Sequence, residues 1–279
     1  NNTAIGYRAL KTLNAGADAY NIGIGSDAGL SFTTGIRNVI IGGIAGDALT
    51  DADFNIGIGY QSLTTDTKGS KSTAVGYRTL ANQNFSTSTD SLNTAVGADA
   101  GLSVTTGIQN TLIGAETGDA LTEGSRNVAV GRNALSADTL GSRSTALGRN
   151  SLASQNFTTA TDSNNVAVGY NSGASVTTGI LNTLVGGEAG DALTEGGRNV
   201  AMGKGALSFD TLGSRSVALG QSALSAQNFT TATNSHNTAV GHAAGGAVTT
   251  GIQNTLIGGL AGDALTDADN NIAIGYGAL

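Results

Sequence analysis

One five-residue phrase recurs sixteen times in this chain and constrains its fold more than any other feature. It begins with Asn or Ser, continues through small, β-branched or aliphatic residues and ends with Gly, as in NTAIG at 2–6, NVAVG at 127–131 and NIAIG at 271–275. The glycines that end successive phrases lie 17 residues apart in three steps and 21 residues apart in the fourth, which makes a block of 72 residues. Gly25, Gly97, Gly169 and Gly241 are accordingly 72 residues apart. A fixed period of this kind is the signature of stacked repeats.

A 17-residue unit is too short for a helical hairpin and suits one coil of short strands and turns. Val, Ile and Thr favour strands, and Gly, Asn, Asp and Ser fill turns. Stacked coils pair each strand in parallel and in register with the same strand of the next coil. We therefore predict an all-β fold, a parallel β-solenoid of about 16 coils that forms a single repetitive domain over 1–279.

Stacking converts the positions of the phrase into columns. The first column is Asn in thirteen coils and Ser in three, and we expect its side chains to hydrogen-bond along the stack. The fourth column is aliphatic throughout, so we predict that it points into the coil together with the second column.

The third column then points outward, although it is Ala or Gly in twelve coils and large in four. An outward apolar stripe predicts a partner surface, which makes the large residues candidates for a trimer interface: Ile40, Leu112, Leu184 and Leu256. The alternative is that both strand faces are buried inside one wide coil.

Composition excludes several classes of function. The net charge of −7 argues against nucleic-acid binding. The chain contains no run of 18 apolar residues, so we predict no segment that spans a membrane. The chain has no Cys, and therefore no disulfide or thiol chemistry. It starts without Met and both ends fall inside the repeat pattern, so we interpret it as a piece of a longer protein or a repeat that stacks end to end.

The phrases NTAIGYRAL at 2–10, STAVGYRTL at 72–80 and NIAIGYGAL at 271–279 resemble the head repeats of YadA-type trimeric autotransporter adhesins. They are also similar to repeats of phage tail fibres, to which the 17-residue coil and the 72-residue block are closer. The resemblance implies a left-handed β-roll, a side-by-side homotrimer and an extracellular adhesive or fibrous role on a bacterial surface or a virion. A host surface protein or a glycan is the partner that such a role implies.

The 21-residue steps insert polar, amide-rich loops at 82–93, 154–165 and 226–237. Each loop carries one aromatic and one glutamine that are candidates for contact with a sugar or a partner: Phe85, Phe157 and Phe229, with Gln83, Gln155 and Gln227. The alternative, which we favour for the aromatics, is that each Phe packs against the stack and anchors its loop. Tyr follows the phrase in five coils, which we interpret as a tolerant exposed column rather than an aromatic ridge.

Closely spaced carboxylates in two segments have the ligand chemistry of a Ca²⁺ site: Asp51 and Asp53, and Asp267 and Asp269. The corresponding segments of the middle blocks carry Arg126 and Arg198 instead, which favours a solvated turn and no cofactor.

Catalysis finds no support in the sequence. His236 and His242, the two histidines, have no counterparts in other blocks, and no nucleophile–base–acid set is readable. We therefore expect a non-enzymatic segment of an extracellular trimeric fibre. Two alternatives stay open: a monomeric solenoid with a flat ligand- or ice-binding face, and a filament subunit that stacks end to end.

Overall fold

The computed structural model describes residues 1–16 and 18–279, and these residues form strands and turns without a helix. One three-residue strand in each coil coincides with the second to fourth columns of the phrase. The strands are β1 (Thr3–Ile5), β2 (Ile22–Ile24), β3 (Val39–Ile41), β4 (Ile56–Ile58), β6 (Thr73–Val75), β8 (Thr94–Val96), β9 (Thr111–Ile113), β10 (Val128–Val130), β12 (Thr145–Leu147), β14 (Val166–Val168), β15 (Thr183–Val185), β16 (Val200–Met202), β18 (Val217–Leu219), β20 (Thr238–Val240), β21 (Thr255–Ile257) and β22 (Ile272–Ile274). The predicted parallel β-solenoid of about 16 coils is confirmed.

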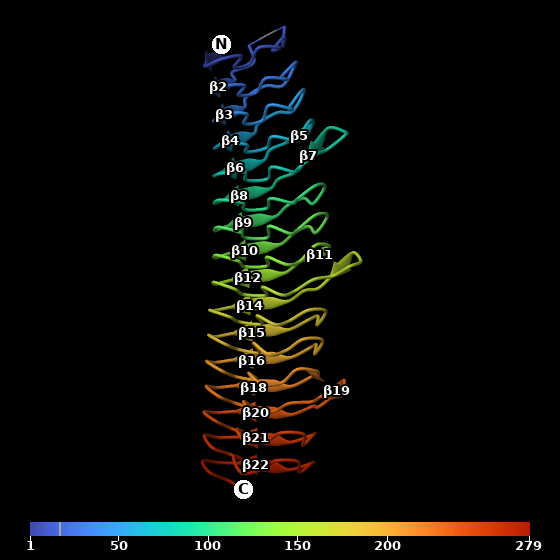
Figure 1. The fold of residues 1–279 in the computed structure, drawn as a ribbon. Helices are drawn as coiled ribbons and strands as arrows, with labels where there is room; N and C mark the ends of the chain where they lie inside the picture. Colours follow the sequence, from blue (N-terminus) through green and yellow to red (C-terminus); the bar gives the residue numbers. More distant parts are fainter. Residues whose placement is uncertain (17) are drawn as a thin grey trace. The chain divides into compact units, whose positions relative to one another are not determined.

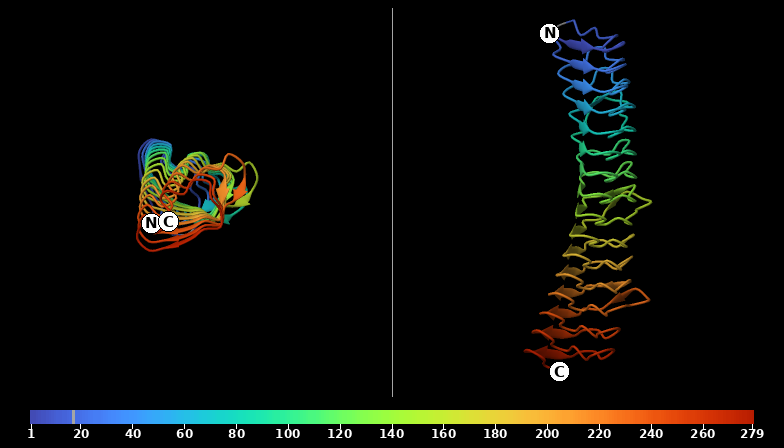
Figure 2. Two further views of the ribbon diagram at one scale, coloured as in Figure 1. Left: turned by 90° about the horizontal axis from the view of Figure 1, so that it is seen from below. Right: turned by 60° about the vertical axis from the view of Figure 1, so that its left-hand side comes forward.

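The chain divides into two compact units. The first comprises Asn1–Ser142 with Thr158–Ala160, and its strands pair in the order β1-β2-β3-β4-β6-β8-β9-β10. The second comprises Arg143–Phe157 with Thr161–Leu279, and its order is β12-β14-β15-β16-β18-β20-β21-β22. In each unit the arrows lie one above another along a single side of the stack (Figures 1 and 2).

Pairing is parallel and in register throughout each unit. The shorter step between coils pairs Ala167 with Leu184, and the longer step pairs Ala218 with Ala239. The longer step keeps this register because its extra residues leave the stack as a protrusion. Two-residue strands mark the protrusions, which Figure 1 shows on the side away from the main ladder: β5 (Gly69–Ser70) paired with β7 (Thr89–Asp90), β17 (Gly213–Ser214) paired with β19 (Thr233–Asn234), and β11 (Gly141–Ser142) and β13 (Thr161–Asp162).

We number each coil from its Asn or Ser, so that the phrase occupies positions 1 to 5. Positions 3, 8 and 12 point into the coil, as Leu184, Ala189 and Leu193 do in one coil, where all three side chains are fully buried. Positions 3 and 9 are never both large, and in twelve coils one of the two is Leu or Ile. Gly190 accompanies Leu184, and a Cβ on that glycine would lie 2.8 Å from the leucine Cδ2. The interior therefore has room for about one large side chain where these positions meet.

The first column forms a hydrogen-bonded ladder, as predicted. Asn182 Oδ1 accepts from the backbone N–H of Asn199 at 3.0 Å, and its Nδ2 donates to the carbonyl of Gly196 at 2.9 Å. The same two bonds recur at Asn21, Asn38 and Asn55. Each buried Asn thereby satisfies a carbonyl near the end of its own coil and an N–H at the start of the next coil, which is why an amide side chain occupies this column.

Candidate interaction surface

The outward face of the main ladder is apolar or neutral in every coil. We call it the outer sheet face; it consists of the side chains at positions 2 and 4. Position 2 is Thr, Val or Ile, and position 4 is Ile, Val, Leu or Met. None of these side chains is buried, and Ile113 and Met202 are 39% and 44% exposed. A parallel sheet is ordinarily covered on both faces, so an open apolar face of this kind marks an interaction surface.

The predicted direction of the columns is therefore wrong. Position 3 points into the coil, and its four large residues are fully buried: Ile40, Leu112, Leu184 and Leu256. They contact the interior of their own chain and cannot form an interface with another. The physical reason is the narrow coil, whose interior accepts mainly Ala and Gly at this position and leaves the β-branched residues outside.

The loop residues proposed as ligand contacts are also inside. Phe85, Phe157 and Phe229 are only 5–6% exposed, which agrees with the alternative that each Phe anchors its loop. The three glutamines, Gln83, Gln155 and Gln227, are fully buried. Neither set is available to a sugar or a partner at the surface.

A polar network missed by the sequence analysis surrounds these glutamines. Gln83 Nε2 donates to Asp66 Oδ2 at 2.5 Å and to Ser72 Oγ at 2.8 Å, and its Oε1 accepts from Asn93 Nδ2 at 2.9 Å. Ser72 in turn hydrogen-bonds Ser91. The Ser that replaces Asn in the first column therefore makes room for the glutamine. The signal in the sequence is that an Asp is followed by a Gln at the same position of the next coil, at 66/83, 138/155 and 210/227.

The four candidate calcium ligands take part in turns. Asp53 Oδ1 and Asp269 Oδ1 accept from backbone N–H groups one coil earlier, at 2.8 Å each. Asp51 and Asp267 each accept from the hydroxyl of the preceding Thr. No group of three or more His, Cys, Asp or Glu residues among those described is arranged to hold a metal ion.

The tyrosines after the phrase are exposed, between 48% and 83%. Tyr60 and Tyr77 stack with centroids 5.9 Å apart, and the Arg78 guanidinium lies 4.9 Å from the Tyr77 centroid. Elsewhere this column carries residues as different as Gly187 and Lys204. The stacked pair is thus a local feature of an exposed column, and His236 and His242 are likewise exposed.

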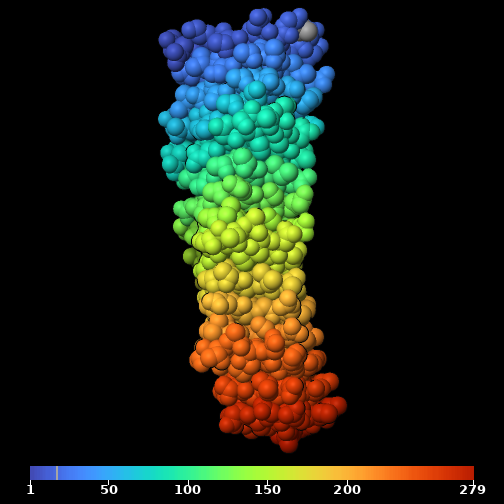
Figure 3. Space-filling model, turned by 90° about the vertical axis from the view of Figure 1, so that its right-hand side faces the viewer, coloured from blue at the N-terminus to red at the C-terminus, as the bar shows by residue number. Residues whose placement is uncertain are grey.

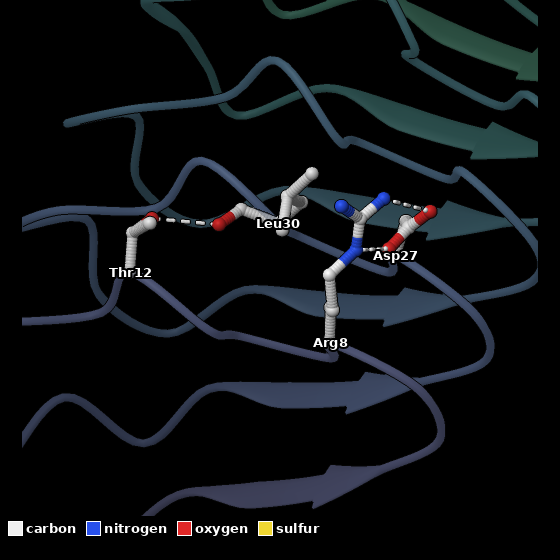
Figure 4. A network of polar contacts seen from close by, with 4 residues as sticks. All are labelled: Arg8, Thr12, Asp27 and Leu30. Carbon is white, nitrogen blue, oxygen red and sulfur yellow. Dashed lines mark hydrogen bonds and ion pairs between the residues drawn. The ribbon is translucent and has the colours of Figure 1, made fainter.

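Two columns of longer side chains border the outer sheet face. Position 7 carries ion pairs between successive coils: Arg8 binds Asp27 through two hydrogen bonds of 2.7 and 2.9 Å (Figure 4), and Arg78 binds Asp99 in the same way. The hydrogen bonds from Arg8 lower the pKa of Asp27. At the other border lies the residue that precedes the next coil, which we call the closing column. It includes Arg37, Arg198 and Arg215.

A regular column of Thr and Asn at position 13 was also missed. Thr194 Oγ1 donates to the carbonyl of Thr211 at 3.1 Å, and Thr50 Oγ1 donates to that of Thr67 at 3.0 Å. The column runs through Thr33, Thr50, Thr67, Asn84, Thr105, Thr122, Thr139, Asn156, Thr177, Thr194, Thr211, Asn228, Thr249 and Thr266, none of which is buried. Figure 3 shows the side from which the protrusions extend, where the coils of each unit follow one another without a deep hollow.

Two carboxylates outside these columns are poorly satisfied. Asp119 Oδ1 and Asp191 Oδ1 are buried without a hydrogen-bond partner among the described residues, and burial raises the pKa of both side chains. Their counterpart Asp47 accepts from Thr64 Oγ1 at 2.6 Å. Among the described residues, no donor of this kind reaches Asp119 Oδ1 or Asp191 Oδ1.

We expect Asp119→Asn and Asp191→Asn to raise the free energy of unfolding slightly at pH 7. A raised pKa means that the folded state binds the proton more tightly, so stability falls as pH rises above about 3.8, the ordinary Asp value. The gain should vanish below that pH. Urea unfolding followed by circular dichroism at pH 7 and pH 3.5 measures it. Asp47→Asn is the control; a gain there, or equal gains at both pH values, would contradict this explanation.

No protein-family model matches the chain, and a search of curated proteins finds no match. The residues that the structure describes include no helix long and apolar enough to cross a membrane.

Proposed function

We propose that this chain is a structural and adhesive segment of an extracellular fibre, formed by three copies that associate side by side through the outer sheet face. The observation that carries the proposal is the continuous open face at positions 2 and 4 in each unit, which contains no charged residue. Association that removes this face from water stabilises the assembly by about 25 cal/mol for each Å² of apolar surface buried. The resemblance to adhesin heads and tail fibres supports the same role.

Three copies suit the dimensions of this face. Its two columns are separated by two strand residues, or about 6.6 Å, so each sheet is very narrow. Three narrow sheets facing a common axis enclose a small core of six side chains per layer. Such an arrangement is a closed cyclic assembly, in which every copy uses the same two borders. Catalysis has no part in this proposal: length, rigidity and repeated contact give the fibre its function through avidity.

Light scattering on a size-exclusion column tests the assembly. We expect a mass of three times the 27.4 kDa chain, and a single chain for the double variant Val168→Lys/Val240→Lys, because six lysines would then face the axis. Thr230→Lys, on an exposed protrusion, is the matched control and should keep the mass of the parent. A parent protein that is a monomer at micromolar concentration would overturn the trimeric fibre.

The Thr and Asn column favours one alternative function, a monomeric solenoid that binds a flat repetitive surface such as ice. Its side chains recur once per coil at the strand spacing of about 4.8 Å, and they are Thr hydroxyls except at Asn84, Asn156 and Asn228. Thermal hysteresis of the purified protein tests this alternative. Activity that disappears in Thr177→Lys/Thr194→Lys would support it, and an inactive parent protein would remove it.

A further inference from the structure

The three protrusions share a tripeptide that the outer sheet face and the buried polar network leave unexplained. It consists of Asn, Phe and a residue with a hydroxyl group: Asn84–Phe85–Ser86, Asn156–Phe157–Thr158 and Asn228–Phe229–Thr230. Asn-x-Ser/Thr, with any residue except Pro in the middle, is the acceptor sequence for attachment of a sugar to the Asn side chain. Apart from Asn1, at the start of the sequence, no other Asn of the chain has Ser or Thr two residues further on.

The three side chains of each tripeptide alternate between the surface and the interior. The Phe is buried, whereas the Asn before it and the Ser or Thr after it are exposed in all three protrusions. The amide and the hydroxyl are therefore both at the surface, with the buried ring fixed between them. The tripeptide also lies in an irregular segment that precedes the short strand of the protrusion. An enzyme that recognises this sequence can thus reach both of the groups that it requires.

The stack itself does not require an amide at the position of this Asn. The other members of the Thr and Asn column are Thr. Asn228 Oδ1 lies 3.1 Å from Thr211 Oγ1, but this hydroxyl is closer to the carbonyl oxygen of Phe229, at 2.8 Å. Since a hydroxyl donates only one proton, the shorter bond accounts for it. Thr67 lies toward Asn84 in the same way, and the Nδ2 atoms of Asn84 and Asn228 donate to no described residue.

Differences between the blocks point to the same tripeptide. The exposed residue two places before the Asn changes freely, from Asn82 to Ser154 and Ala226. The exposed Asn is kept in all three blocks, and the third residue changes only from Ser86 to Thr158, which keeps the hydroxyl. The two exposed groups that stay the same are thus those of the acceptor sequence.

We propose that Asn84, Asn156 and Asn228 are acceptor sites for N-linked glycosylation. The co-substrate is a sugar whose anomeric carbon carries a diphosphate leaving group, and a separate transferase brings it to the protrusion. The Asn Nδ2 attacks the anomeric carbon, so that a C–N bond forms as the C–O bond to the diphosphate breaks. The diphosphate leaves with the electron pair of that bond, and a base of the transferase takes one amide proton. The protrusions extend on the side away from the main ladder, so the sugars leave the outer sheet face free (Figure 1).

Mass spectrometry of peptides from the protein as its natural source produces it tests the assignment. We expect a sugar adduct at each of the three sites, located by fragmentation. Asn82 and Asn234 are exposed on the same protrusions without a hydroxyl two residues further on, and should be unmodified. The adduct mass distinguishes single sugars, added one at a time, from a preassembled oligosaccharide. Bare Asn at all three sites would overturn the proposal, whatever the oligomeric state of the protein.

Variants made in the same source separate recognition of the tripeptide from mere exposure. Asn228→Gln and Thr230→Ala should each lose the adduct at this site, whereas Thr230→Ser should keep it, because Ser also supplies the hydroxyl. Thr231→Ala, at the exposed neighbouring residue, is the matched control and should be modified like the parent. Circular dichroism confirms that each variant is folded. An adduct on Asn228 that persists in Thr230→Ala would show that the tripeptide is not recognised and would contradict the proposal.

Discussion

Gly203→Ala should destabilise the protein by about 4 kcal/mol, more than most single substitutions. Gly203 ends its phrase with a φ of +132°, a conformation that residues with a Cβ rarely adopt. An added Cβ would also lie 2.5 Å from the carbonyl oxygen of Gly220 in the next coil. That oxygen belongs to the backbone and has no room to move without disturbing the stack. Both the backbone strain and the steric clash therefore weaken the contact between two neighbouring coils.

Gly205→Ala, two positions further along the same coil, is the matched control. Its φ is +63°, and the nearest atom to an added Cβ is Ser208 Oγ at 3.9 Å. Only the backbone conformation is then unfavourable, at about 1 kcal/mol. Urea unfolding at equal protein concentration measures the difference, since assembly makes stability concentration-dependent. Equal costs for the two variants would show that contact with the next coil does not decide the choice of glycine.

Much of the fold could be predicted from the period alone. The spacing of the glycines gives the number of coils, and the Val, Ile and Thr of the phrase give the strands. The Asn column gives the ladder, since a buried amide repeated at one position needs partners at the coil spacing. Asn182 and Asn199 make the bonds that this argument requires. These features depend only on local propensity and on the fixed repeat.

The direction of the side chains could not be predicted by the usual rule that aliphatic residues point inward. Here both faces of the strand are apolar, and interior volume decides between them. The informative signal is the balance between positions 3 and 9: Leu184 accompanies Gly190, whereas Ala201 accompanies Leu207. Two positions that are never large together lie in the same part of the interior. This pattern indicates that position 3 points into the coil, and therefore that positions 2 and 4 form the outer sheet face.

The buried polar layer escaped prediction for a related reason. Asp210 and Gln227 occupy position 12, where the coils before and after them carry Leu193 and Val248. Polar residues in a loop are ordinarily assigned to the surface. Their burial becomes evident only when the longer coil is aligned with its neighbours, which puts Gln227 directly over Asp210.

Asp210→Ala should cost about 3 kcal/mol or more, because removing the carboxylate leaves three buried N–H groups without an acceptor, two of the backbone and one of the two in the Gln227 amide, and each such group costs about 1–3 kcal/mol. The buried carboxylate accepts from the backbone N–H groups of Gly213 at 3.0 Å and Phe229 at 3.2 Å, and from Gln227 Nε2 at 2.6 Å. The protrusion that begins at Phe229 should loosen at the same time. Urea unfolding gives the stability, and limited proteolysis near Thr230 reports on the protrusion.

Asp210→Asn tests the hydrogen-bond acceptor alone, because Asn keeps the shape of Asp but replaces one carboxylate oxygen with an NH₂ group. Gln227 cannot turn its amide to accommodate the new NH₂ group, because its Nε2 also donates to Ser216 Oγ and its Oε1 accepts from Asn237 Nδ2, both at 2.8 Å. Asn should therefore lose about 1–3 kcal/mol despite its matching size. Asp267→Ala, exposed and bonded only to the Thr266 hydroxyl among described residues, should change stability by less than about 0.5 kcal/mol. If Asp210→Asn were as stable as the parent, the layer would be held by packing around Phe229 instead of by its hydrogen bonds.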